Sequence, residues 1–217
     1  MNKQKAILIV TSVHAEKEAI EKGIRNASQF DIIVAGVGQA AAAARTATAL
    51  AKKKYDYVIN AGIAGGFEGR ADMGSIVIST DIIAADLGAE SSEGFLSLEE
   101  LHLGDSKLVV DGDMVNRFCT QAVSMGVDVH QGAILTLSTV TGTQETTDLL
   151  LNRFPDAVAE GMEGFGVAEA AKQHGVPVME MRSISNKIGP RDRDAWRIKE
   201  ALAMLEKASS VMVEVFS

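Results

Sequence analysis

The sequence has few of the residues that build disulfides or metal clusters. Its 217 residues include one cysteine and four histidines. The single thiol, Cys119, cannot form an intrachain disulfide, and a cysteine metal cluster is excluded. The histidines do not recur at the H-x-x-x-H spacing typical of zinc sites. We therefore expect neither a metal ion nor another cofactor.

Long apolar runs and blocks of positive charge are also missing. No apolar stretch approaches the roughly 18 residues of a membrane-spanning helix, and the chain does not open on a secretory signal pattern. The formal net charge is −8, and the only basic run is at residues 52–54. An anionic partner would be repelled. We expect a cytoplasmic protein that binds neither nucleic acid nor a membrane.

The chain does contain a regular alternation of apolar and helical segments. Runs rich in Ile and Val predict strands at residues 6–11, 30–35, 57–60, 75–83, 127–137, 157–160 and 176–185. Helices are expected at residues 15–25, 40–53, 113–125, 143–152, 164–174 and 194–216. This order predicts an α/β fold, a single domain over residues 1–217 with three α/β/α layers around a mixed, mostly parallel sheet. Residues 84–111 lack a sustained period and predict a functional loop or an excursion at the sheet edge.

Two glycine-rich segments follow predicted strands. Residues 36–41 fit the G-x-G-x-x-A pattern of dinucleotide sites, but no acidic residue ends the next strand. A nicotinamide-binding reductase is therefore disfavoured, and close packing of an alanine-rich helix explains the pattern at least as well. Residues 60–67 contain Ile63, Ala64 and Gly65, and their glycines would let the backbone approach a flat ligand. A tight turn that needs positive φ is the alternative.

Charged and amide side chains stand where ligands bind in open α/β sheets, beyond the carboxyl ends of strands. Glu16 lies on the first turn of a predicted helix, where the helix dipole favours the ionised carboxylate. Glu163 sits in a glycine-flanked turn beside Met162, which suits contact with a ligand more than a simple cap. The last predicted strand ends in Arg182 and Asn186. An ordinary surface glutamate remains the alternative for Glu16.

In combination, these motifs resemble the purine nucleoside phosphorylase/uridine phosphorylase superfamily across nearly the whole chain. The matching segments are residues 11–16, 36–42, 60–66, 161–164 and 182–186. Within the superfamily the chain is similar to the nucleosidases that hydrolyse methylthioadenosine and S-adenosylhomocysteine, and residues 185–198 resemble the futalosine hydrolases of menaquinone biosynthesis. The resemblance implies an N-ribosyl hydrolase that releases hypoxanthine and dehypoxanthine futalosine from futalosine. It also implies a homo-oligomer, either a dimer or a tetramer.

The resemblance also assigns roles to individual residues. It implies that Glu163 holds the ribose hydroxyls above Met162 and that Glu16 positions the attacking water. Arg182 and Asn186 match the family's arginine and its base-contacting acid. The implied substrate-binding residues further include Ile63, Ala64, Gly65 and Val140.

Asn186 is the main departure from the adenosine-type nucleosidases, which carry aspartate there. An amide can donate to the O6 or N7 acceptors of a 6-oxopurine. Adenine would leave a buried polar group unmatched, at a cost of roughly 1–3 kcal/mol. Asn186 therefore favours hypoxanthine as the leaving group, assisted by hydrogen bonding because an amide is not a full proton donor.

Water is favoured over phosphate as the nucleophile. Residues 11–18 contain no arginine, and they include two carboxylates beside the single cation Lys17. Phosphate next to Glu16 would be repelled, whereas Glu16 could act on water as a general base. The rival functions are a methylthioadenosine/S-adenosylhomocysteine nucleosidase, a purine nucleoside phosphorylase and a non-catalytic nucleoside-binding sensor.

Arg191 and Arg193 precede the last predicted helix. An arginine pair could bind the carboxylate on the 5′ side of futalosine. Ion pairs with Asp192 or Asp194 explain them equally well, with Asp194 as a candidate helix cap.

Overall fold

The computed structural model describes residues 5–25 and 27–217 of the chain. The strands are β1 (Ile7–Thr11), β2 (Phe30–Val34), β3 (Tyr57–Gly66), β4 (Ile76–Ala84), β5 (Gly88–Ser91), β6 (Gly94–Ser97), β7 (Lys107–Val109), β8 (Val129–Thr136), β9 (Ala157–Gly161) and β10 (Val178–Lys187). The helices are α1 (His14–Ile24), α2 (Gln39–Lys52), α3 (Gly112–Ser124), α4 (Gln144–Arg153), α5 (Gly164–Gln173) and α6 (Ile198–Val215).

The central sheet is mixed, and part of it closes on itself. Its strand order is β10-β4-β8-β9-β3-β1-β2, with β7 beside β4 and an additional pairing between β10 and β3. That additional pairing joins β3, β10, β4, β8 and β9 into a ring. Parallel pairs predominate, and the antiparallel pairs are β10–β4, β3–β9 and β4–β7. The expected mixed, mostly parallel sheet is confirmed, and its closure is an addition that the sequence did not predict.

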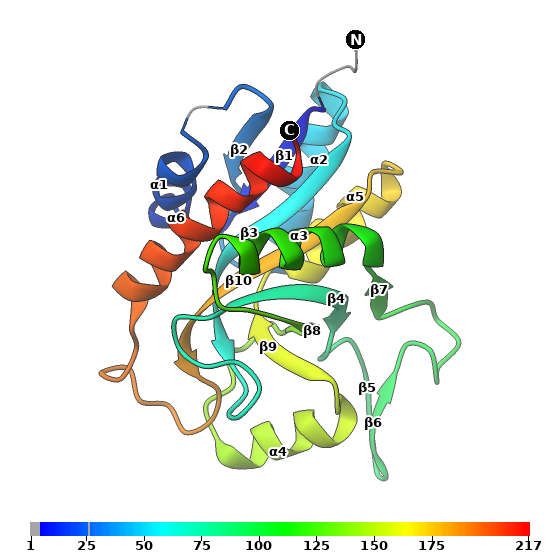
Figure 1. The fold of residues 1–217 in the computed structure, drawn as a ribbon. Helices are drawn as coiled ribbons and strands as arrows, with labels where there is room; N and C mark the ends of the chain where they lie inside the picture. Colours follow the sequence, from blue (N-terminus) through cyan, green and yellow to red (C-terminus); the bar gives the residue numbers. More distant parts are fainter. Residues whose placement is uncertain (1–4, 26) are drawn as a thin grey trace.

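Helices cover both faces of the sheet (Figure 1). Successive side chains of a strand point to opposite faces, and in these strands both sets are apolar, so both faces are buried under helices. In β1, Ile7 and Ile9 belong to the cluster that includes α1, α3 and α6. Leu8 and Val10 belong to the cluster with α2 and α5. The expected three-layer arrangement is therefore confirmed.

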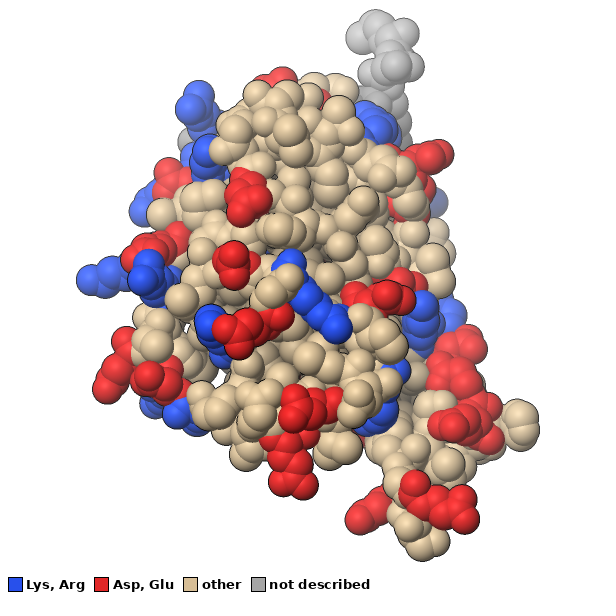
Figure 2. All heavy atoms as spheres, turned by 60° about the horizontal axis from the view of Figure 1, so that its bottom comes forward, with Lys and Arg blue, Asp and Glu red and all other residues tan. Residues whose placement is uncertain are grey.

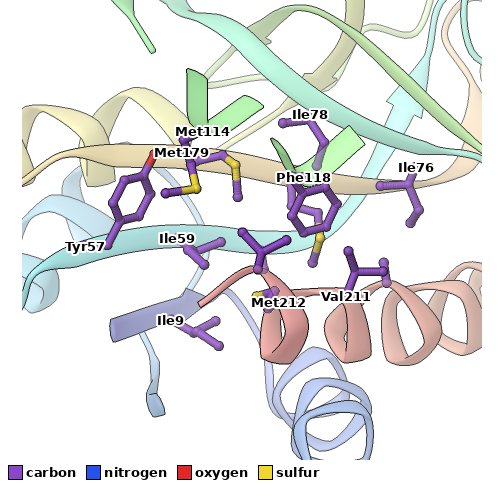
Figure 3. Packing of buried hydrophobic residues seen from close by; sticks show 14 of the residues in the cluster. Ile9, Tyr57, Ile59, Ile76, Ile78, Met114, Phe118, Met179, Val211 and Met212 are labelled. Atoms are coloured by element: carbon purple, nitrogen blue, oxygen red, sulfur yellow. The ribbon is translucent and has the colours of Figure 1, made fainter. Parts of the chain in front are cut away.

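The larger cluster fixes the strands that carry the site. Figure 3 shows Phe118 of α3 and Met212 of α6 in one packed cluster with Ile59 of β3 and Met179 of β10. All four side chains are 0% exposed. At roughly 1.5–3 kcal/mol for each fully buried large apolar side chain, such packing holds β3 and β10 firmly in place.

The glycine-rich segment after residue 60 is a strand and not a turn. Residues 61–66 continue β3, which pairs with β10 and, at Gly65 and Gly66, with β9. None of the three glycines at 62, 65 and 66 is among those with positive φ. The expected end of the strand at residue 60 was wrong because long-range pairing outweighs the weak strand propensity of glycine.

The last helix begins later than its pattern predicts. α6 starts at Ile198, whereas the sequence indicated residue 194. The Asp192 carboxylate accepts a hydrogen bond from the Asp194 N–H, which closes a local turn, and Arg197 occupies the N-cap position. Asp194 is therefore not the cap. Residues 194–197 lie in a loop instead, and Trp196 of this loop lines the cavity described below.

Residues 84–111 make the predicted excursion at the sheet edge. β5 and β6 pair as a two-stranded antiparallel hairpin, and β7 joins the edge of the main sheet beside β4. Figure 2 shows basic and acidic side chains interspersed over one face of the molecule, with acidic ones gathered on this protruding segment. Its exposed acids include Glu90, Glu93, Glu99 and Glu100.

Candidate active site

A cavity of about 290 Å³ lies at the carboxyl ends of β1, β3 and β10. β9 runs antiparallel to β3. Its last residues also reach this cavity, because Glu160 pairs with Gly65 near the carboxyl end of β3. The lining residues come from seven stretches of chain and are Ser12, Val13, Glu16, Val37, Ile63, Ala64, Gly65, Val140, Glu160, Gly161, Met162, Glu163, Ser185, Asn186 and Trp196. The structure thus brings together all of the expected site residues except the three arginines, whose positions are given below.

Glu16 is buried in this cavity and held by backbone amides. Its Oε2 accepts from the N–H groups of Ser12 (2.9 Å) and Val13 (3.1 Å), and its Oε1 accepts from Ile63 N–H (2.9 Å). Burial raises the pKa of the carboxyl, while Arg182 and the three amides act to lower it. The nearby Glu18 is exposed on the outer side of α1. Glu16 is therefore the acid of this loop that faces the cavity.

Glycine at position 62 is required by this arrangement. A Cβ there would lie 2.5 Å from Oε1 of Glu16 and 2.8 Å from Nη1 of Arg182. The missing side chain lets a carboxylate and a guanidinium approach the backbone of β3 directly. Steric access, and not an unusual φ angle, explains this glycine.

Arg182 lies behind the cavity and organises its carboxylates. The side chain is 1% exposed, and its Nε donates to Glu180 Oε1 at 2.7 Å. Its Nη2 lies 3.3 Å from Oε2 of Glu163 and donates to it. Burial acts to lower the pKa of Arg182, but the carboxylates of Glu180, Glu163 and Glu16 outweigh it and raise the pKa. The guanidinium is therefore a fixed positive charge.

Glu180 was not found by sequence reasoning. It sits inside an apolar strand, and its side chain is 0% exposed. Burial raises its pKa, against the opposing effect of Arg182. A carboxylate interrupting a buried strand two residues before an arginine is the signal that could have revealed this pair.

Glu163 is held between two distant segments. Its Oε1 accepts from Gly38 N–H at 3.1 Å, while Arg182 donates to its Oε2. Gly38 has φ of +92°, a conformation that favours glycine. The G-x-G-x-x-A segment therefore contributes a backbone donor to Glu163.

A β-bulge in β10 aims Asn186 into the cavity. The register shifts between Ile184 and Asn186, so Ser185 and Asn186 together stand opposite Gly65. Ser185 Oγ donates to Asn186 Oδ1 at 2.9 Å, and Asn186 Nδ2 donates to the Lys187 carbonyl at 3.0 Å. The carbonyl requires a donor there, which fixes the orientation of the amide.

Glu160 is another acid that the sequence did not reveal, and unlike Glu180 it lines the cavity. Its Oε1 accepts from Thr141 N–H at 2.9 Å. Its Oε2 is buried and, in the part of the chain that the structure describes, has no hydrogen-bond partner. Burial raises the pKa of this carboxyl, against the opposing effect of Thr141. Its position three residues before Glu163 was the available signal.

The two remaining arginines lie apart from the main cavity. Arg191 lines an adjoining cavity of about 340 Å³ that shares Asn186 and Trp196 with the first. Its guanidinium lies 5.4 Å from the centre of the Trp196 ring. Arg193 is exposed and lines neither cavity.

The described residues contain no group of three or more His, Cys, Asp or Glu side chains that could hold a metal ion. In residues 5–25 and 27–217, no helix has the length and apolar character needed to cross a membrane.

Comparison with known proteins assigns the family. Residues 13–217 match the family model described as the phosphorylase superfamily. The chain belongs to the phosphorylase superfamily. Within that superfamily it is 43% identical to a futalosine hydrolase of Streptomyces coelicolor, over 96% of this chain and 95% of the relative. It is 44% identical to a futalosine hydrolase of Acidothermus cellulolyticus, over 94% of this chain and 89% of the relative.

A solved structure supports the superfamily fold. The 5′-methylthioadenosine/S-adenosylhomocysteine nucleosidase of Neisseria meningitidis, in complex with methylthio-immucillin-A, superimposes with a TM-score of 0.84. The two chains are 20% identical, and the match covers 97% of this chain and 99% of the other. At that identity the likeness speaks for the fold.

Proposed function

We propose that this protein hydrolyses the N-glycosidic bond of futalosine and releases hypoxanthine and dehypoxanthine futalosine in menaquinone biosynthesis. The observation that carries the proposal is a cavity in which a fixed carboxamide, Asn186, lies in the same space as Glu16 and Glu163. The futalosine hydrolases among its relatives support the choice of substrate. We expect a cytoplasmic homo-oligomer.

The sugar is held by Glu163 over Met162. A carboxylate has about four lone-pair sites, and Gly38 and Arg182 each take one on Glu163. The remaining sites can accept hydrogen bonds from ribose hydroxyls. Because Arg182 fixes the carboxylate, its charge is preorganised to stabilise the positive charge that develops on the sugar as the base departs.

The nucleophile is a water activated by Glu16. Oε2 of Glu16 takes two amide N–H groups and Oε1 takes one, which leaves Oε1 a lone pair for a water proton. The raised pKa brings this carboxylate closer to the basicity of an effective general base. No cation other than Lys17 lies in the loop from Thr11 to Glu18, so a phosphate nucleophile would lack a cationic cradle there.

The leaving base meets Asn186. One N–H of its amide group is taken by Lys187, and the second can donate to O6 or N7 of a 6-oxopurine. A hydrogen bond to the departing purine anion lowers the barrier without full proton transfer. The side chain therefore favours hypoxanthine over adenine as the leaving group.

The deciding experiment is chromatographic detection of free hypoxanthine after incubation with futalosine in phosphate-free buffer. We expect hypoxanthine and a reducing sugar product, with a rate that added phosphate does not increase. Methylthioadenosine, tested in parallel, should release its base far more slowly. Formation of a sugar 1-phosphate would instead indicate a phosphorylase, and faster release of adenine would indicate an adenosine-type nucleosidase.

A further inference from the structure

One lining carboxylate has no role in the reaction described above. Glu160 is the penultimate residue of β9, and it is buried at 4% exposure. Thr141 N–H binds one carboxylate oxygen, while the other is buried and, among the residues described, unpaired. An unsatisfied buried acceptor is unfavourable in the empty protein. A ligand that donates a hydrogen bond would satisfy it.

Strand register places Glu160 in one row with the base-contacting amide. Glu160 stands opposite Gly65 across the β9–β3 pair, and Gly65 stands opposite Asn186 across the β3–β10 pair. A Cβ on Gly65 would lie 3.2 Å from Asn186 Nδ2 and 3.6 Å from Glu160 Cγ. Ile188 Cγ1 would be closer still, at 2.8 Å, so a side chain at position 65 would not fit. Gly65, Glu160 and Asn186 all line the cavity, with Glu160 and Asn186 on either side of the glycine.

The two groups have opposite hydrogen-bonding characters, and so do the two edges of a 6-oxopurine. Hypoxanthine presents O6 and N7 as acceptors and N1–H as a donor, whereas N1 of adenine is an acceptor. The Thr141 N–H could have donated a hydrogen bond to an acceptor on the base, but it already donates to Glu160. At this position the site therefore offers an acceptor.

We infer that Glu160 is a specificity-determining residue that accepts the N1–H of a 6-oxopurine while Asn186 donates to O6 or N7. The inference rests on the proposed function, because it assigns the nucleobase to the Asn186 end of the cavity. If adenine were bound, a lone pair of the Glu160 carboxylate would face the lone pair on N1, and no hydrogen bond could form between them. The 6-amino base is therefore rejected at both residues and not at Asn186 alone.

The test is Glu160→Gln, assayed on inosine and adenosine, which share one sugar, and on futalosine and its 6-amino counterpart. Glutamine can still accept from N1–H and can also donate to N1 of adenine. We expect the ratio of kcat/KM for the 6-oxo over the 6-amino substrate to fall roughly 10- to 100-fold. Glu145→Gln, at an exposed glutamate of α4, is the matched control and should leave the ratio unchanged.

An equal loss on both members of each pair would overturn the inference, because it would indicate a general structural or catalytic role. If Glu160→Gln does not fold, calorimetric binding of hypoxanthine and 1-methylhypoxanthine to the unaltered protein replaces the kinetic test. We expect at least tenfold weaker binding of the methylated base, which lacks the N1–H, and equal binding would overturn the inference. Absence of hypoxanthine release from futalosine would refute the proposed function alone, since the inosine and free-base measurements would still test Glu160.

Discussion

Nη2 of Arg182 lies 3.3 Å from Oε2 of Glu163, and both side chains are almost completely buried. The carboxylate that we assign to the sugar is thus oriented from behind by a residue outside the cavity lining. The position of Glu163 depends on this contact, and each of the two partners can be tested by its own substitution.

Replacing Glu163 with glutamine should abolish most turnover while leaving the fold intact. The change removes the negative charge that stabilises the cationic sugar, and we expect kcat/KM for futalosine to fall by about 10²–10³. Steady-state kinetics measures the loss, and circular dichroism checks the fold. A sensor protein would bind futalosine without turnover before and after the change.

Replacing Arg182 with methionine should destabilise the protein. Glu180 and Glu163 would lose their buried counter-ion, and removal of one partner from a buried ion pair typically costs about 3–5 kcal/mol. Urea denaturation measures the free energy of unfolding. Arg193→Met, at an exposed arginine, is the matched control and should change stability by less than about 0.5 kcal/mol. Comparable losses in the two variants would contradict this account of Arg182.

The pH dependence of the reaction should report Glu16. A general base must be ionised, and burial raises the pKa of this carboxyl, so activity is lost as the pH falls through that raised pKa. We therefore expect the acidic limb of kcat/KM to lie above the usual range of a glutamate. Glu16→Gln should lower kcat by about 10²–10⁴ and remove the limb. Glu18→Gln, two residues further along the chain, should preserve both rate and limb, and an acidic limb that survives in Glu16→Gln would exclude Glu16 as its source.

Substitution of Gly62 by alanine should impair catalysis more than its small size suggests. The added Cβ would collide with Oε1 of Glu16 and Nη1 of Arg182, and one of these groups must move. A displacement of about 1 Å in a catalytic group can lower the rate about 100-fold. Gly112→Ala in α3 has open space and should keep full activity while stabilising the helix by about 0.4–1 kcal/mol. Normal turnover by Gly62→Ala would show that the close approach has no catalytic importance.

Arg191 and Arg193 should differ in their effect on substrate binding. Only Arg191 lines the cavity that adjoins the base site at Trp196. If the carboxylate of futalosine reaches this cavity, Arg191→Ala should raise KM for futalosine about tenfold or more and leave inosine cleavage little changed, because the charge-assisted hydrogen bond is lost. Arg193→Ala should behave like the unaltered protein. Equal effects of Arg191→Ala on both substrates would remove the idea of carboxylate recognition.

Local patterns predicted most of the helices and strands, but they did not predict where all of these elements begin and end. The continuous apolar run of β1 placed this strand correctly, because a strand that is buried on both faces has apolar side chains at successive positions. The continuation of β3 through Gly62 was missed, since it depends on pairing with β9 and β10 far along the chain. The late start of α6 was missed for a similar reason, because Asp192 forms a local turn where Asp194 could have capped a helix.

The three polar side chains to which we assign the chemistry were predicted because each follows the end of a predicted strand. Glu16, Glu163 and Asn186 carry that signal, and the structure brings them to one cavity. Glu180 and Glu160 lie within strands, where alternation alone gives no reason to expect a buried acid. Their environment arises from partners such as Thr141 and Arg182, whose proximity exists only in the folded chain.

The closure of the sheet has a consequence for biosynthesis of the protein. β10 is the final strand of the chain, and its pairing with both β3 and β4 completes the ring. A growing polypeptide on the ribosome therefore cannot assemble the ring before Lys187 has emerged, although β3 and β4 are made much earlier. Until then the two early strands lack their shared neighbour, and the nascent chain has no binding cavity.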